Sequence, residues 1–184
     1  FRAENDRLYE RYIAGTLDIR ESIRHQVKPL VENAPEKLRH WREEFIKKRI
    51  EPVITPAALA LVDEHRAAKD DLAIITASNS FVTRPIADRF GIETLLAVEL
   101  ERVDDRYTGR ALGTPTFREG KVSRLREWLL ERDLSLDGGY FYSDSLNDLP
   151  LLRLVDNPVA VNPDPVLLAH AEAAGWPVLR LNGG

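Results

Sequence analysis

Short apolar runs alternate with helical segments from residue 72 to residue 181, and this alternation constrains the fold more than any other feature of the sequence. Continuous apolar runs of a few residues are typical of buried strands, and apolar residues at every third or fourth position are typical of helices. The predicted strands are residues 72–75, 140–142, 158–161 and 178–181. The predicted helices between them lie at residues 81–90, 120–132, 149–154 and 165–174. This order predicts an α/β fold, a Rossmann-like parallel sheet with helices on both faces.

Two further segments complete the predicted architecture. Residues 1–50 carry apolar residues at helical spacing, with Pro35 suited to the first turn of a helix. Thr55, followed directly by proline, predicts the N-cap of another helix. Residues 95–100 and 107–112 flank a pair of aspartates, and they are predicted to form a β-hairpin.

Composition excludes several classes of function. The formal net charge is -4 and both signs are mixed along the chain, so no basic stripe favours nucleic acid. No apolar run is long enough to span a bilayer, and we expect a soluble, cytoplasmic protein. The chain has no cysteine, so any metal must be held by oxygen or histidine. The histidines show no metal-ligand spacing and are expected to be surface or packing residues: His25, His40, His65 and His170.

The most informative polar cluster follows the predicted strand at residues 140–142. Residues 143–148, here called the Asp144 turn, place Asp144, Asn147 and Asp148 between that strand and the next helix. One interpretation is that Asp144 or Asn147 caps the following helix and that Asp148 complements its dipole. The other is a magnesium site, because two close carboxylates repel unless a cation lies between them, and Mg²⁺ prefers oxygen ligands. Carboxyl ends of parallel strands are where α/β folds bind ligands, so both interpretations stay open.

Two more positions are candidate phosphate ligands. Thr76 follows the strand at residues 72–75 and precedes small residues, which lets backbone N–H groups approach an anion. The alternative is that this segment only caps the next helix, with Ser78, Asn79 or Ser80 as the N-cap residue. Lys121 lies in the first turn of its helix, where a cation opposes the helix dipole. We therefore expect Lys121 to reach an anionic partner, either a phosphate or the carboxylates of the Asp144 turn.

Taken in order, Thr76, Lys121 and Asp144-x-x-Asn147-Asp148 resemble the second, third and fourth signature motifs of the haloacid dehalogenase (HAD) superfamily. The arrangement is most similar to the branch that contains phosphoserine phosphatases. The resemblance implies that residues 1–52 are a small helical cap and residues 53–184 the core domain.

The resemblance also implies a Mg²⁺-dependent hydrolase of small phosphate monoesters that forms an aspartyl-phosphate. Asp144 would bind the metal and Asp148 would support its water shell or Lys121. Thr76, the Ala77 N–H, Lys121 and Asn147 would bind the phosphate, with Lys121 and Thr76 counted as catalytic. The partner would be a small phosphorylated metabolite, such as phosphoserine or histidinol phosphate, and the protein a monomer or homodimer.

Two departures from the family pattern matter. Thr76-Ala77-Ser78 stands where phosphoserine phosphatases usually carry Ser-Gly-Gly, and Ser143-Asp144-Ser145 stands where they carry Gly-Asp-Gly, which weakens phosphoserine as the substrate. The first motif, Asp-x-Asp-x-Thr, is absent from residues 1–184.

In the family the first motif ends a central strand and supplies the nucleophile and the general acid. We therefore expect that strand to lie upstream of residue 1, and residues 1–184 alone to be inactive. The alternative is a protein that binds a phosphorylated metabolite as a sensor or regulator, without catalysis. The sequence names neither the substrate nor the cap residues that select it.

Overall fold

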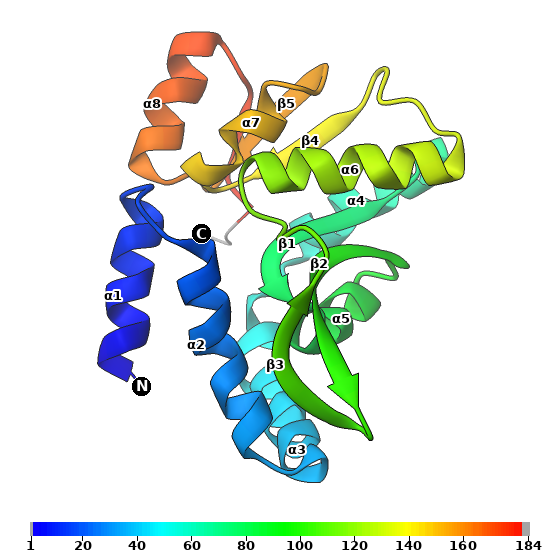
Figure 1. Cartoon of the computed structure of the whole chain (residues 1–184). Coiled ribbons are helices and arrows are strands. Elements are labelled where there is room, and N and C mark those ends of the chain that lie inside the picture. Colours follow the sequence, from blue (N-terminus) through cyan, green and yellow to red (C-terminus); the bar gives the residue numbers. More distant parts are fainter. Residues whose placement is uncertain (1, 182–184) are drawn as a thin grey trace. The chain divides into compact units, whose positions relative to one another are not determined.

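Helices occupy the first third of the chain, as the apolar spacing predicts (Figure 1). The computed structural model describes residues 2–181. The helices in this part are α1 (Arg2–Ile13), α2 (Ile19–Glu32), α3 (Pro35–Phe45) and α4 (Pro56–Ala68). Pro35 opens α3, and the Thr55 hydroxyl accepts a hydrogen bond from the Ala58 N–H at 3.2 Å at the start of α4. Both predicted helix starts are confirmed. Between α3 and α4, a π-helical turn (Ile46–Ile50) and a 3₁₀ turn (Glu51–Val53) continue the chain.

The chain divides into two units, which we describe separately. Unit 1 comprises Phe1–Ser22 and Phe117–Gly184, and unit 2 comprises Ile23–Thr116. The expected division into a cap (residues 1–52) and a core (residues 53–184) is a separate matter and stays a prediction.

Unit 2 contains a parallel strand pair and the predicted hairpin. Its elements after α4 are β1 (Ala73–Asn79), α5 (Ser80–Arg89), β2 (Thr94–Val103) and β3 (Arg106–Leu112). β1 pairs with β2 in parallel, so α5 serves as the crossover that a parallel pair requires. β2 and β3 are antiparallel, and the hairpin turns at Asp104 (φ 49°) and Asp105 (φ 63°). Positive φ at both positions matches the right-handed twist of the strands, and aspartate tolerates it better than most residues.

Unit 1 contains a second sheet that is parallel throughout, in the order β4-β5-β6. Its elements are α6 (Glu119–Arg132), β4 (Tyr140–Ser143), a 3₁₀ turn (Leu146–Asp148), α7 (Leu149–Leu152), β5 (Asn157–Val161), α8 (Pro165–Ala174) and β6 (Val178–Leu179). The core between sheet and helices is fully buried at Leu152, Ala160, Leu167 and Ala171. This packing fixes the carboxyl ends of β4 and β5, from which the Asp144 turn and Asp164 emerge.

The two sheets confirm the predicted α/β class and also show where strand pairing stops. Among residues 2–181, β2 is the only strand that pairs with β1, and β5 is the only strand that pairs with β4. Strands β1 and β4 therefore each have one edge to which a further strand could add its backbone hydrogen bonds. No helix in the described part of the chain is long and apolar enough to cross a membrane.

Candidate functional site

The Asp144 turn is capped by a serine and not by its acidic residues. The Ser145 hydroxyl accepts a hydrogen bond from the Asn147 N–H at 3.2 Å, which closes the 3₁₀ turn. Asp148 occupies the N-cap position of α7 but makes no side-chain capping bond there. Neither Asp144 nor Asn147 caps a helix with its side chain, so that part of the capping interpretation is wrong.

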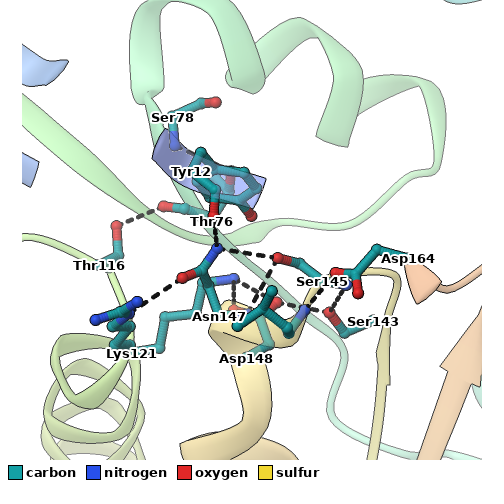
Figure 2. Close-up of polar contacts among 12 residues, drawn as sticks. Tyr12, Thr76, Ser78, Thr116, Lys121, Ser143, Ser145, Asn147, Asp148 and Asp164 are labelled. Atoms are coloured by element: carbon teal, nitrogen blue, oxygen red, sulfur yellow. Dashed lines mark hydrogen bonds and ion pairs between the residues drawn. The ribbon is translucent and has the colours of Figure 1, made fainter. Parts of the chain in front are cut away.

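Asp148 forms a buried ion pair with Lys121 from the first turn of α6 (Figure 2). The Lys121 Nζ lies 2.7 Å from Asp148 Oδ1 and 2.8 Å from Oδ2, and both side chains are 8% exposed. The Ser143 hydroxyl donates a third hydrogen bond to Oδ2 at 2.7 Å. A buried charge is tolerated when it is paired and its remaining lone pairs are satisfied. The expectation that Lys121 reaches a carboxylate of the Asp144 turn is confirmed.

Asp144 differs from Asp148 because it is exposed and no cation of the described chain forms an ion pair with it. Although the residue as a whole is exposed, partial burial of its carboxyl group raises the pKa of Asp144, and the neighbouring Asp148 and Asp164 carboxylates raise it further. Its backbone N–H and Lys121 act in the opposite direction. Acidic neighbours that disfavour a second negative charge would favour a bound cation.

The oxygen donors of this turn fit Mg²⁺ in kind, since carboxylates and water are its usual ligands. Within the described residues, no group of three or more histidine, cysteine or acidic side chains could by itself hold a metal ion. Both carboxylate oxygens of Asp148 already interact with Lys121, and one of them also accepts a hydrogen bond from Ser143. Asp144 is therefore the carboxylate of the turn that is available to a metal ion. The turn would thus supply part of a coordination shell, and water or another carboxylate would have to supply the rest.

Asn147 is 2% exposed, and its side chain joins two other parts of unit 1. Its Nδ2 donates to the Tyr12 carbonyl at 2.8 Å, and its Oδ1 accepts from Arg118 Nε at 3.1 Å. The predicted role of Asn147 toward phosphate or water remains a prediction. Sequence reasoning missed both Tyr12 and Arg118, because each lies far from Asn147 along the chain. Tyr12 is 135 residues away and Arg118 is 29 residues away.

Asp164 is a second residue that sequence reasoning missed. Its Oδ1 accepts from the N–H groups of Val166 and Leu167 at 2.9 and 2.8 Å and so caps α8. Its Oδ2 accepts from the Leu146 N–H at 2.7 Å, and its own N–H donates to the Asp144 carbonyl at 2.8 Å. Asp164 thereby holds the backbone of the Asp144 turn. The signal was present in the sequence, since Asp164 follows the predicted strand at 158–161 and carboxyl ends of neighbouring parallel strands share one edge.

The Tyr12 phenol also faces the Asp144 turn. Burial raises the pKa of Tyr12, and the Asp148 and Asp144 carboxylates add to the rise, while hydrogen bonds to Ser145 and Asn147 lower it. The phenol therefore stays neutral at physiological pH and can act only as a hydrogen-bonding group.

Thr76 lies in unit 2, so its predicted place beside Lys121 remains a prediction. The Thr76 hydroxyl accepts from the Ser78 N–H at 3.1 Å, and its carbonyl accepts from the Thr116 hydroxyl (Figure 2). Helix α5 is capped by Asn79, whose Oδ1 accepts from the Val82 N–H at 3.2 Å. Asn79 was one of the three residues expected as the N-cap under the capping alternative, so that part of the alternative is confirmed. In the described structure the Thr76 hydroxyl proton has no acceptor and is available to a ligand.

Unit 2 also has a hollow of about 470 Å³ between α3, α5 and the hairpin, which Thr76 and Ala77 do not line. Most of its arginines are already bound. Arg84 donates to the carbonyls of Ile92 and Glu93, and Arg39 and Arg102 both face Asp105. The hollow therefore shows no built anion site that would compete with the Asp144 turn.

Comparison with known proteins assigns the family. Residues 2–153 match the family described as haloacid dehalogenase-like hydrolase. The chain is 44% identical over 182 residues to a protein of Neisseria meningitidis serogroup C named histidinol-phosphatase, covering 97% of this chain and 82% of that protein. It is 34% identical over 136 residues to a phosphoserine phosphatase of Mycobacterium tuberculosis, covering 74% of this chain and 44% of that longer protein.

Solved structures agree on the fold. A protein of unknown function from Bordetella pertussis Tohama I superposes with a TM-score of 0.89 at 47% identity, covering 98% of this chain and 82% of that one. A substrate-bound phosphoserine phosphatase superposes with a TM-score of 0.70 at 19% identity, covering 96% and 79%, which shows the fold alone. From the match over residues 2–153 and the 44% identity, the chain belongs to the haloacid dehalogenase-like hydrolases.

Proposed function

We propose that this protein is a Mg²⁺-dependent phosphatase that hydrolyses small phosphate monoesters through an aspartyl-phosphate. The observation that carries the proposal is the buried Lys121–Asp148 pair directly beside the exposed Asp144 carboxylate. A buried ion pair of a lysine and a carboxylate is costly to build for stability alone. Family membership and relatives named as phosphatases support the same activity.

Each residue has a distinct proposed role. Asp144 would hold Mg²⁺, which when bound would neutralise charge on the phosphoryl oxygens. Asp148 would orient Lys121 and support the water shell of the metal, and Lys121 would balance the charge of the phosphate. The Thr76 hydroxyl and the Ala77 N–H would donate hydrogen bonds to phosphate oxygens, and Asn147 would face the phosphate or a bound water. Phosphoryl transfer chiefly requires such positioning and charge neutralisation.

The nucleophile is proposed to be an aspartate outside residues 1–184, since these residues contain no Asp-x-Asp. Its carboxylate oxygen would form a bond to phosphorus while the bond from phosphorus to the ester oxygen breaks. The leaving alcohol would take a proton from a second aspartate of that motif. Water would then attack phosphorus, releasing inorganic phosphate and restoring the carboxylate. The open edge of β1 in unit 2, or that of β4 in unit 1, could accept a strand that carries this motif.

For the substrate we propose histidinol phosphate ahead of phosphoserine. The relative named histidinol-phosphatase matches 97% of this chain, whereas the phosphoserine phosphatase of M. tuberculosis matches 74%. The Thr76-Ala77-Ser78 and Ser143-Asp144-Ser145 sequences also depart from the glycine-rich pattern of phosphoserine phosphatases. We further propose that the enzyme acts on soluble metabolites in the cytoplasm, as a monomer or homodimer.

The test uses the full-length protein, including any segment that precedes residue 1. Phosphate release is measured with histidinol phosphate, phosphoserine and a generic aryl phosphate, each with Mg²⁺ and with a chelator. We expect Mg²⁺-dependent release that Asp144→Asn abolishes and that the control Asp71→Asn, an exposed aspartate outside the site, leaves intact.

Two results would reject the proposal. One is the lack of any Mg²⁺-dependent turnover by the full-length protein, and the other is full turnover by Asp144→Asn. Saturable binding of a phosphorylated metabolite without phosphate release would instead support a sensor or regulator. Phosphate release by residues 1–184 alone would refute the proposed origin of the nucleophile.

A further inference from the structure

Arg118 has a backbone conformation that a residue with a side chain rarely adopts. Its φ is 50° and its ψ is -119°, at the position that precedes the first turn of α6. This region of backbone space is populated mainly by glycine, because a Cβ atom clashes there. The Arg118 side chain makes no capping bond to α6, so helix capping does not account for the conformation.

The Arg118 guanidinium instead joins two segments of unit 1. Its Nε donates to Asn147 Oδ1 at 3.1 Å, and its Nη2 donates to the carbonyl of Gly15. The guanidinium also lies over the ring of Phe117, with 5.1 Å between the guanidinium carbon and the ring centroid. One side chain thus contacts both the Asp144 turn and the linker between α1 and α2 (residues 14–18). Strained backbone positions of this kind are concentrated at functional sites.

A glycine in the linker leaves space for the Arg118 guanidinium. Gly15 has φ +68°, and a Cβ atom added there would lie 3.0 Å from Arg118 Nη2. Near the end of α1, the Tyr12 carbonyl accepts a hydrogen bond from Asn147 Nδ2 at 2.8 Å. Arg118, Asn147 and the 12–15 segment therefore form a closed set of hydrogen bonds, in which the Asn147 amide is held at both ends.

We propose that Arg118 is a positioning residue that locks the α1–α2 linker onto the Asp144 turn and so fixes the Asn147 amide and the Tyr12 phenol. Its consequence for catalysis rests on the proposed phosphatase function, whereas the locking itself does not. Asn147 cannot turn toward solvent while Arg118 Nε and the Tyr12 carbonyl hold its two ends. Loss of Arg118 frees the Oδ1 end of the amide and removes the hydrogen bond that holds the Gly15 carbonyl, so the linker can move away from the turn.

The variant that separates these effects is Arg118→Gly in the full-length protein. Glycine accepts φ near +50°, so the backbone is relieved and the protein is expected to fold. The guanidinium is lost, together with its hydrogen bonds. We expect amide hydrogen exchange in residues 14–18 to become about 10-fold faster or more, because a hydrogen bond from a charged group is removed.

The catalytic readout compares kcat with the apparent affinity for Mg²⁺. We expect kcat to fall about 10-fold while the apparent affinity for Mg²⁺ stays within about twofold, since Asp144 itself is untouched. Low concentrations of free guanidinium, well below those that unfold the protein, should partly restore both kcat and the slow exchange of the linker. A residue that contributed only to global stability would not respond to this rescue.

Asp133→Gly is the matched control. Asp133 ends the same helix, α6, with φ 54°, and it does not take part in the Arg118 contacts. Its replacement also introduces glycine at a positive-φ end of α6, where Asp133 has the left-handed helical ψ of 42°, and it should leave linker exchange and kcat unchanged.

If the linker amides of Arg118→Gly exchange at the wild-type rate, Arg118 does not lock the linker. If they exchange faster but kcat is unchanged, Arg118 is not a positioning residue for catalysis. If the wild-type protein shows no turnover at all, the proposed function fails, and linker exchange still decides whether Arg118 locks the linker.

Discussion

The buried pair between Lys121 and Asp148 makes the sharpest quantitative prediction. Lys121→Met retains the length and apolar stem of the side chain but removes the ammonium group. The Asp148 carboxylate then stays buried with Ser143 as its remaining side-chain hydrogen-bond donor in the described structure. Because the pair is only 8% exposed, water cannot replace the lost ammonium without local opening.

The expected magnitude follows from the burial and the geometry of the pair. Removing one partner of a buried, hydrogen-bonded ion pair costs about 3–5 kcal/mol of unfolding free energy, because the other charge is left without compensation. Lys121→Met should therefore cost about this much, and Asp148→Asn should be strongly destabilising too. The double variant should lose less than the sum of the two single losses, with a coupling of about 2 kcal/mol, since it no longer buries a lone charge.

The assay is urea unfolding at neutral pH with a chelator present, so that metal binding does not contribute. Trp128 on α6 and Trp176 near β6 provide fluorescence signals from unit 1. Arg124→Met is the matched control on the same helix, because Arg124 pairs at 3.0 Å with the exposed Glu127. An exposed pair of this kind should contribute about 0.5 kcal/mol or less.

The reasoning would be refuted by additive losses. If the double variant lost the sum of the single losses within about 0.5 kcal/mol, the two side chains would not interact energetically. A loss for Lys121→Met no larger than that for Arg124→Met would contradict the burial of the pair.

Three further predictions concern the surroundings of the Asp144 turn. Asp164→Ala should cost about 2–3 kcal/mol in urea unfolding, because it removes the cap of α8 and the acceptor for a backbone N–H of the turn; a loss below about 1 kcal/mol would contradict both roles. Gly15→Ala should destabilise more than Gly138→Ala, measured as a difference in melting temperature. Both glycines have positive φ, but only at Gly15 would the new methyl group meet a neighbour, Arg118, at 3.0 Å. Burial raises the pKa of Asp144, so protons should compete with Mg²⁺ at a higher pH than at an ordinary aspartate. Titration calorimetry over a pH series that runs from pH 7 down through the ordinary range of an aspartate should show affinity falling as pH falls, and an affinity that Asp144→Asn leaves unchanged would mean that Asp144 does not bind the metal.

Most secondary structure was predictable because it depends on local chemistry. The Thr55-Pro56 helix start, the hairpin around Asp104-Asp105 and the β-α alternation after residue 72 all appear where the sequence places them. Boundaries differ by a few residues, and β1 extends to Asn79 into the polar cluster that follows the apolar run. Backbone pairing with β2 continues there although the hydrophobic pattern has ended.

The candidate site was predictable only in part. Asp144, Asn147 and Asp148 were found because they are close in sequence and follow a strand. Lys121 was found because a cation in the first turn of a helix is unfavourable without an anionic partner. Nothing in the sequence paired Lys121 with Asp148 in preference to Asp144, and that choice depends on which carboxylate the fold buries.

By itself, the sequence determined the α/β class, the helical first third, the hairpin and the residue types of the candidate site, because periodicity, capping and turn chemistry act over a few residues. Only the tertiary structure decided how these residues divide their roles. In the folded protein Asp148 pairs with Lys121 and Ser143, whereas Asp144 stays exposed. Ser145 caps the 3₁₀ turn. Three residues distant in sequence also contact the turn: Tyr12, Arg118 and Asp164. The physical reason is that burial and long-range hydrogen bonds depend on which segments pack together, and that packing cannot be read from neighbours in the chain.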